Sequence, residues 1–214
     1  MALYAIADTH LSFGTDKPMD SFPGWSDYTV RLAANWRHLV EPQDTVVIAG
    51  DISWAMKFAE CTADFAFLND LPGQKILLKG NHDYWWNTKR KMDLYLQENH
   101  FDTLQILHNQ AIPYGNVALC GSRGWFFEDA PEAQDEKVLA REVGRIRMSL
   151  EAAGDREKIV FLHYPPVTTG NACAPIVELL QQCDAFGRAF GGPTGIGDRF
   201  FGKRNDVFLT KGDT

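Results

Sequence analysis

One pattern recurs along this sequence and constrains its fold more than any other: a short apolar run that stops at polar residues. Four such runs occur, at residues 3–7, 45–49, 75–78 and 158–162. Their length and their aliphatic or β-branched composition predict buried β-strands. Side chains with carboxylate, imidazole or amide groups follow each run directly or within a few residues. Ligands in open α/β sheets bind outside the carboxyl ends of the strands, so we expect these polar side chains to converge.

Segments with helical spacing of apolar residues lie between and after the predicted strands. We expect helices from residue 26 or 27 to 40, over 53–71, from 87 or 88 to about 98, over 135–153 and over 174–182. A Gly-Asn turn between Ile112 and Val117 predicts a β-hairpin. Strands that alternate with helices favour an α/β layer architecture. Residues after Cys183 are rich in glycine and show no clear organisation before a candidate strand at 206–210.

The length and composition bound the class of protein. A chain of 214 residues fits one domain over 1–214, which can bury a large core without disulfide staples. Hydrophobic residues make up 45% and charged residues 23%, values that exclude disordered and fibrous classes. The net charge of −7 disfavours a broad nucleic-acid surface, because phosphate backbones are held by clustered Lys and Arg. It does not disfavour a single nucleotide or a small ester.

Cysteine usage and hydropathy indicate the compartment. The four cysteines are widely spaced and form no C-x-x-C pair, which favours a reducing environment. The N-terminus has no basic segment before its first strand, and no apolar run approaches the ~20 residues that span a bilayer. We therefore expect a cytoplasmic protein without membrane contact.

The polar clusters at the strand ends together predict a metal site. Each cluster alone has an ordinary explanation, as a turn, a helix cap or a hydrogen-bonded core histidine. Their joint occurrence at four strand ends favours ligation. Carboxylate, imidazole and amide oxygen form a mixed set that suits Mn²⁺, Fe or Zn²⁺ better than Ca²⁺. If Asp51 bridges two ions, a water shared by them would lose a proton near neutral pH and could attack phosphorus.

The motifs resemble those of the calcineurin-like metallophosphoesterase superfamily. They are D-T-H at residues 8–10, G-D at 50–51, G-N-H-D at 80–83 and the strand-end His163. The longer strings G-D-I-S-W-A-M-K, L-L-K-G-N-H-D-Y-W-W and L-H-Y-P-P are similar to a bacterial branch of predicted phosphohydrolases. The resemblance implies a four-layer α/β/β/α sandwich, in which two central mixed β-sheets are flanked by helices. It also implies hydrolysis of phosphomonoesters or phosphodiesters with two divalent metal ions.

The same resemblance implies a role for each motif residue. Five residues are the implied metal ligands: Asp8, His10, Asp51, Asn81 and His163. His82 would stabilise the transferring phosphoryl group and protonate the leaving oxygen. Asp83 is a candidate to orient His82, as carboxylates commonly do beside an imidazole. Arg123 is either a phosphate contact, because a guanidinium matches phosphate geometry, or an arginine of a surface loop.

The sequence departs from the family pattern near its end. The family has a late G-H-x-H motif, whereas residues 187–191 read G-R-A-F-G, with Arg188 and Phe190 in place of the histidines. Neither side chain can donate a lone pair to a metal. The protein could bind its metals loosely, could have kept phosphate binding without catalysis, or could have an altered sequence after about residue 183. No histidine follows His163, so Asp198, Asp206 or water would have to fill the positions.

Two functions from different classes follow. The leading hypothesis is a metal-dependent phosphoesterase that acts on a small phosphoester or nucleotide, with activity reduced by the missing histidines. The alternative is a catalytically impaired phosphate- or nucleotide-binding or scaffolding protein on the same fold. Four aromatic residues next to the motifs either stack on a nucleobase or belong to the core: Trp54, Tyr84, Trp85 and Trp86.

Overall fold

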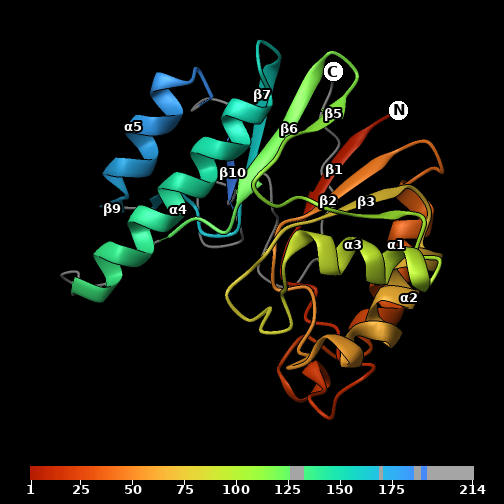
Figure 1. The fold of residues 1–214 in the computed structure, drawn as a ribbon. Helices are drawn as coiled ribbons and strands as arrows, with labels where there is room; N and C mark the ends of the chain where they lie inside the picture. The colour runs from red at the N-terminus through yellow and green to blue at the C-terminus, as the bar shows by residue number, and fades with distance from the viewer. Residues whose placement is uncertain (126–132, 169–170, 186–188, 192–214) are drawn as a thin grey trace. The chain divides into compact units, whose positions relative to one another are not determined.

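A computed structural model describes residues 1–125, 133–168, 171–185 and 189–191. The chain divides into two compact units, and the boundary between them falls between Ile106 and Leu107. Figure 1 shows the helices and strands of both units. Each unit has its own β-sheet with helices against it, and each is described separately below.

A four-stranded parallel sheet forms the centre of the first unit. Its strands stand in the order β1 (Leu3–Ile6), β2 (Thr45–Ile48), β3 (Gln74–Leu77) and β4 (Leu104–Ile106). The register places Ile6, Ile48 and Leu77 side by side at the carboxyl edge. The polar segments that follow β1, β2 and β3 therefore leave the sheet at the same edge, as the sequence predicts.

Helices pack on one face of this sheet. They are α1 (Tyr28–Leu39), α2 (Thr62–Asp70) and α3 (Lys89–Glu98), with short 3₁₀ turns η1 (Met19–Ser21) and η2 (Phe58–Cys61). Trp36 of α1 and Phe65 of α2 are fully buried in the core beneath the sheet. The indole of Trp36 also donates a hydrogen bond to the carbonyl of Pro72 at 2.9 Å. Truncating an aromatic side chain buried in this way costs about 3–5 kcal/mol of stability.

The predicted helix over 53–71 is wrong in its first part, because residues 53–57 are not helical and α2 begins at Thr62. Ser53 instead pairs with Leu11 in a parallel bridge. The helical turns start only after Lys57, where the carboxylate of Glu60 accepts hydrogen bonds from the backbone N–H groups of Met56 at 2.9 Å and Lys57 at 3.1 Å. Tertiary contacts of the segment at Ser53 override the helical spacing of its apolar residues.

The second unit contains a mixed sheet. Its order is β10 (Ala189–Gly191), β7 (Glu157–Leu162), β6 (Val117–Ser122) and β5 (Ile112–Tyr114). The pair β5 and β6 is antiparallel, which confirms the predicted hairpin, and Gly115 adopts the left-handed conformation at φ 57° that its turn requires. The other two pairs are parallel. Two short strands, β8 (Val167–Thr168) and β9 (Asn171–Ala172), form a separate antiparallel pair that the sequence did not predict.

Two helices cover one face of this sheet and run beside each other (Figure 1). They are α4 (Ala133–Ala152) and α5 (Ala174–Gln182), both predicted from their apolar spacing. Ile146 and Leu150 of α4 pack with Ile176 of α5 in a core that also contains Cys120 and Val160 of the strands. Helical segments with strong apolar periodicity are thus found where the sequence places them.

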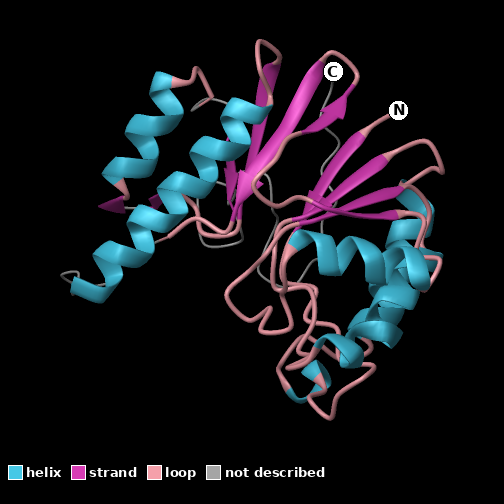
Figure 2. Cartoon of the chain, viewed as in Figure 1, coloured by secondary structure: helices cyan, strands magenta, loops and turns pink. Residues whose placement is uncertain are grey.

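The predicted α/β class is confirmed, with helices against the sheet in each unit (Figure 2). Within the described residues, the sheet of the first unit is parallel and that of the second unit is mixed. The four-layer packing and the single domain over 1–214 stay predictions. The candidate strand at 206–210 lies outside the described residues. Among the residues that the structure describes, no helix has the length and apolar character needed to cross a membrane.

Candidate metal centre

The segments that follow β1 and β2 are joined by backbone hydrogen bonds beyond the edge of the sheet. The N–H of Asp8 donates to the carbonyl of Gly50 at 3.0 Å, and the N–H of His10 donates to the carbonyl of Asp51 at 2.9 Å. Asp8, His10 and Asp51 all have positive φ, at 57°, 42° and 51°. Residues other than glycine rarely adopt this conformation, and those that do cluster at functional sites. The backbone therefore holds these three residues in an uncommon geometry at the edge where ligands are expected.

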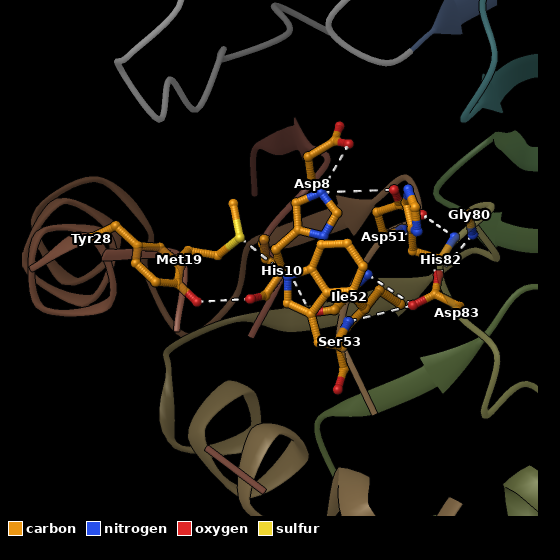
Figure 3. A network of polar contacts seen from close by, with 12 residues as sticks. Asp8, His10, Met19, Tyr28, Asp51, Ile52, Ser53, Gly80, His82 and Asp83 are labelled. Atoms are coloured by element: carbon orange, nitrogen blue, oxygen red, sulfur yellow. Dashed lines mark hydrogen bonds and ion pairs between the residues drawn. The ribbon is translucent and has the colours of Figure 1, made fainter. Parts of the chain in front are cut away.

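Their side chains converge on one point. The Nε2 atom of His10 lies 3.6 Å from Oδ1 of Asp8 and 3.7 Å from Oδ2 of Asp51. The two carboxylates offer oxygens within 4.8 Å of each other. Figure 3 shows the imidazole between the two carboxylates, joined to them by dashed lines. Three of the five predicted metal ligands are thus brought together within the first unit.

The electrostatics of this cluster favour a bound cation. Burial, and next the negative charge of Asp51, raise the pKa of the Asp8 carboxyl to about 8. The Oδ2 atom of Asp8 is buried and accepts no hydrogen bond from the described residues. A buried carboxylate oxygen without a donor is costly unless a proton or a cation meets it. The set of two carboxylates and one imidazole fits a divalent metal ion of the Mn²⁺, Fe or Zn²⁺ type.

The segment after β3 completes the cluster from the other side of Asp51. The backbone N–H of His82 donates to Oδ1 of Asp51 at 2.8 Å. A side chain at Gly80 would place its Cβ 2.1 Å from that same oxygen and 2.2 Å from the backbone nitrogen of Asp51, so only glycine fits. The centroid of the His82 ring lies 5.9 Å from that of His10. The structure therefore puts His82 beside the three converging side chains of Asp8, His10 and Asp51.

The family model of calcineurin-like phosphoesterases matches residues 1–192. The chain belongs to the calcineurin-like phosphoesterase family. No curated protein matches the chain.

Solved structures resemble the chain at low sequence identity. A protein of Thermus thermophilus is 15% identical, with a TM-score of 0.54 and coverage of 99% of this chain and 98% of that chain. A phosphopantetheinyl hydrolase from Mycobacterium tuberculosis is 16% identical, with a TM-score of 0.45 and coverage of 93% and 79%. A protein of unknown function from Aquifex aeolicus is 18% identical, with a TM-score of 0.46 and coverage of 89% and 88%. The first likeness supports the shared fold, and the other two are looser.

The ligand roles of all five motif residues stay predictions, and the other two of them are Asn81 and His163. Asn81 is half-buried in the segment after β3, between Gly80 and His82. His163 follows β7 in the second unit and is 7% exposed. Arg188 lies outside the described residues, and the backbone of Phe190 in β10 pairs opposite Phe161 of β7.

Arg123, predicted to contact phosphate, is bound within the second unit. Its guanidinium lies 3.5 Å from Oε1 of the buried Glu142 and 4.8 Å from the ring centroid of Trp125, over the ring. The backbone carbonyl of Arg123 also accepts a hydrogen bond from the N–H of Tyr164 at 2.8 Å. Its role as a substrate contact stays a prediction.

Asp83, predicted to orient the His82 ring, is fully buried beneath the segment after β2. Burial raises the pKa of its carboxyl to about 7, although backbone hydrogen bonds act in the opposite direction. Its carboxylate accepts hydrogen bonds from backbone N–H groups and from the indole of Trp85. None of its hydrogen bonds to the described residues involves the His82 imidazole, so the orienting role stays a prediction.

The sequence did not assign to Trp54 a contact with the predicted metal ligands. Its ring stacks on His10 with centroids 4.7 Å apart, and it contacts His82 at the same centroid distance. Trp85, by contrast, is 1% exposed and packs in the core against Phe65. The only sign of this contact in the sequence was that Trp54 lies three residues after Asp51. A tryptophan at that position could equally belong to the hydrophobic core.

Proposed function

We propose that this member of the family is a metal-dependent hydrolase of phosphomonoesters or phosphodiesters. One observation carries the proposal: the imidazole of His10 lies within 3.7 Å of the carboxylates of both Asp8 and Asp51, beside His82. The buried oxygen of Asp8 without a hydrogen-bond donor supports a cation at this point. Family membership supports phosphoester hydrolysis as the chemistry.

Two divalent ions of the Mn²⁺, Fe or Zn²⁺ type are the proposed cofactors. Asp8, His10 and Asp51 would hold one ion, and the family resemblance assigns Asn81 and His163 to the other. When bound, the ions would supply a nucleophile by lowering the pKa of a water molecule, and they would neutralise charge on the phosphate. We further propose that the protein acts in the cytoplasm on a small phosphoester or nucleotide.

His82 is the proposed proton donor to the leaving oxygen. Its backbone is fixed by the hydrogen bond to Asp51, and its ring is flanked by Trp54 and by Tyr84, whose ring centroid lies 6.1 Å away. These contacts limit the rotation of the imidazole. A positioned general acid of this kind contributes roughly 10²–10⁴-fold to the rate.

The test uses the purified chain with Mn²⁺ and two substrates, p-nitrophenyl phosphate and bis-p-nitrophenyl phosphate. Asp51→Asn is expected to lose most bound metal and turnover, whereas His82→Ala should keep the metal and lose turnover by roughly 10²-fold or more. Asp70→Asn, at an exposed carboxylate of α2, is the matched control and should keep both. A wild-type protein without bound metal, and without turnover that depends on Asp51 or His82, would sink the proposal.

A second candidate function is phosphate or nucleotide binding without turnover. The observation that favours it lies in the sequence, where Arg188 and Phe190 replace the two late histidines of the family. The double variant Arg188→His with Phe190→His separates the two functions. A gain in metal occupancy and rate would indicate an enzyme weakened by ligand loss, whereas phosphate binding without any gain would favour a binding protein.

A further inference from the structure

Three consecutive backbone N–H groups after β2 point at one carboxylate. The N–H groups of Asp51, Ile52 and Ser53 donate to Asp83 at 2.9, 2.9 and 3.4 Å. The left-handed conformation of Asp51 turns successive N–H groups toward the same side, which creates a concave anion site of the kind called a nest. In this chain the nest is filled by an internal side chain.

Both oxygens of Asp83 are saturated with donors. Oδ2 accepts from the N–H groups of Asp51 and Gly80, the latter at 2.7 Å. Oδ1 accepts from Ile52 and Ser53 and from the indole of Trp85 at 3.1 Å. The residue is 0% exposed. Only an ionised carboxylate offers acceptors alone at both atoms, so an amide cannot replace it without turning a donor toward other donors.

The position of Asp83 explains why the segment after β2 needs it. On one side, this segment continues the pairing of β2 with β1, since the N–H of Leu11 donates to the carbonyl of Ile52 at 2.9 Å. On the other side, β3 ends at Leu77 and the chain turns at Gly80. The N–H groups that face this side therefore have no strand to pair with. The carboxylate of Asp83 takes the place of the missing strand.

We propose that Asp83 is a positioning residue that acts through the backbone of Asp51 and thereby sets the affinity of the site for its metal. This inference rests on the proposed function, because it takes Asp51 as a ligand. The nest fixes the backbone from which the Asp51 carboxylate extends toward His10, and the segment that carries Asp83 also supplies the His82 N–H that binds the same carboxylate. Asp83 thus acts on the ligand rather than on the His82 ring.

Asp83→Asn tests this with Mn²⁺ titration by calorimetry, in parallel with turnover. We expect Mn²⁺ affinity to fall roughly 10- to 100-fold, as for other residues that support a metal ligand. At saturating Mn²⁺, kcat and its pH profile should return to within about threefold of the wild type, because His82 keeps its ring contacts. An orienting role at His82 would instead lower kcat and shift its pH profile at any Mn²⁺ concentration.

Asp44→Asn is the matched control. Asp44 is also buried and also accepts backbone hydrogen bonds, from the N–H of Ala2 at 2.6 Å and of Glu41 at 3.0 Å, but at the opposite edge of the same sheet. We expect the Asp44→Asn variant to have a lower melting temperature than the wild type and the same Mn²⁺ affinity. Equal losses of affinity in both variants would reduce Asp83 to a general structural role and overturn the inference.

Trp85→Phe provides a milder variant if Asp83→Asn does not fold. It removes only the indole donor and keeps a ring in the core, so Mn²⁺ affinity should fall by about two- to fivefold. Wild-type affinity in whichever variant folds would overturn the inference, as would a loss of turnover that saturating Mn²⁺ does not restore. Failure of the proposed function is distinguishable, because the wild type itself would then bind no Mn²⁺ and turn over neither substrate.

Discussion

The indole of Trp54 lies nearly parallel to the imidazole of His10, with ring centroids 4.7 Å apart and planes at 15°. The Nε1–H group of the same indole donates a hydrogen bond to the sulfur of Met19 at 3.1 Å, which restricts rotation of the indole about its side-chain bonds. Trp54 thereby limits the imidazole to orientations in which Nε2 faces Asp8 and Asp51. The stack holds the imidazole of a predicted metal ligand in place through ring contact.

Replacing Trp54 should loosen the metal site. We expect Trp54→Leu to weaken Mn²⁺ binding by about 2- to 10-fold, because the ring contact worth about 0.5–1.5 kcal/mol no longer holds the imidazole. Trp54→Phe should retain most of the affinity. Tyr84→Leu is the control, since Tyr84 contacts the ring of His82. Calorimetric Mn²⁺ titration checks the order, and equal weakening in the Trp54→Leu and Tyr84→Leu variants would contradict it.

Gly80→Ala should displace the Asp51 carboxylate. The added Cβ would meet the backbone nitrogen of Asp51 at 2.2 Å, and backbone cannot move aside as a flexible side chain can. We expect at least tenfold weaker Mn²⁺ binding and a loss of about 1–3 kcal/mol in the free energy of unfolding. Gly144→Ala in α4 is the control, because its Cβ would meet no atom within 4 Å. That variant should gain about 0.5–1 kcal/mol and bind Mn²⁺ normally.

The strand ends were predictable because their signal is local. Each apolar run before Asp8, Asp51 and Asn81 stops within a few residues of the ligand-type side chain, and parallel strands share a carboxyl edge. No long-range information is needed to place these residues near one another. The hairpin at Gly115 and helix α5 were predictable for the same reason, since turn chemistry and apolar spacing lie within one segment.

The contacts that shape the site were not predictable, because they join residues far apart in the chain. Ser53 was predicted to be helical but is not, because it pairs with Leu11 and donates to Asp83, which is 30 residues away. Asp51 and Ile52, whose N–H groups also bind Asp83, are about as far from it in the sequence. The sequence motif therefore pointed to the adjacent His82 as the partner of Asp83. The stack of Trp54 on His10 likewise depends on how two segments cross, and residue spacing carries no information on this.

Glu142→Gln should destabilise the protein. The carboxylate of Glu142 is 1% exposed and accepts hydrogen bonds from the guanidinium groups of Arg123 and Arg145 and, at 2.8 Å, from the hydroxyl of Ser122. A neutral amide would leave two guanidinium groups without their shared counter-charge. We expect a loss of about 1–3 kcal/mol in urea denaturation.

Glu151→Gln, at an exposed position of the same helix, is the control for Glu142 and should change stability by no more than about 0.5 kcal/mol. A similar small effect in Glu142→Gln would show that Arg123 and Arg145 do not depend on the carboxylate. Arg123 would then be available for the phosphate contact that the sequence suggests.

Lys75 of β3 is a buried cation without a carboxylate partner at its ammonium among the described residues. Its Nζ donates to the carbonyl of Gly73 at 2.8 Å and to that of Leu71, and the residue is 0% exposed. Burial lowers the pKa of this ammonium from 10.5 to about 8, against a smaller opposite effect of Asp70. The folded chain therefore releases this proton at a lower pH than the unfolded chain does.

This shift fixes the direction of a pH effect on stability. Between about pH 8 and 10.5 the unfolded chain binds more protons at Lys75, so its contribution to the free energy of unfolding rises with pH. Below about pH 8 the destabilising effect of the buried charge is fully present.

In Lys75→Met the contribution is absent, so the stability of the variant minus that of the wild type should fall as pH rises from 8 to 10. Urea denaturation at a series of pH values measures this difference. Lys158→Met is the control, because Lys158 also donates to two carbonyls but at a partly exposed position, and an equal change with pH in that variant would show that burial is not the cause. A pH-independent difference for Lys75→Met would show that its ammonium is not desolvated in the folded state.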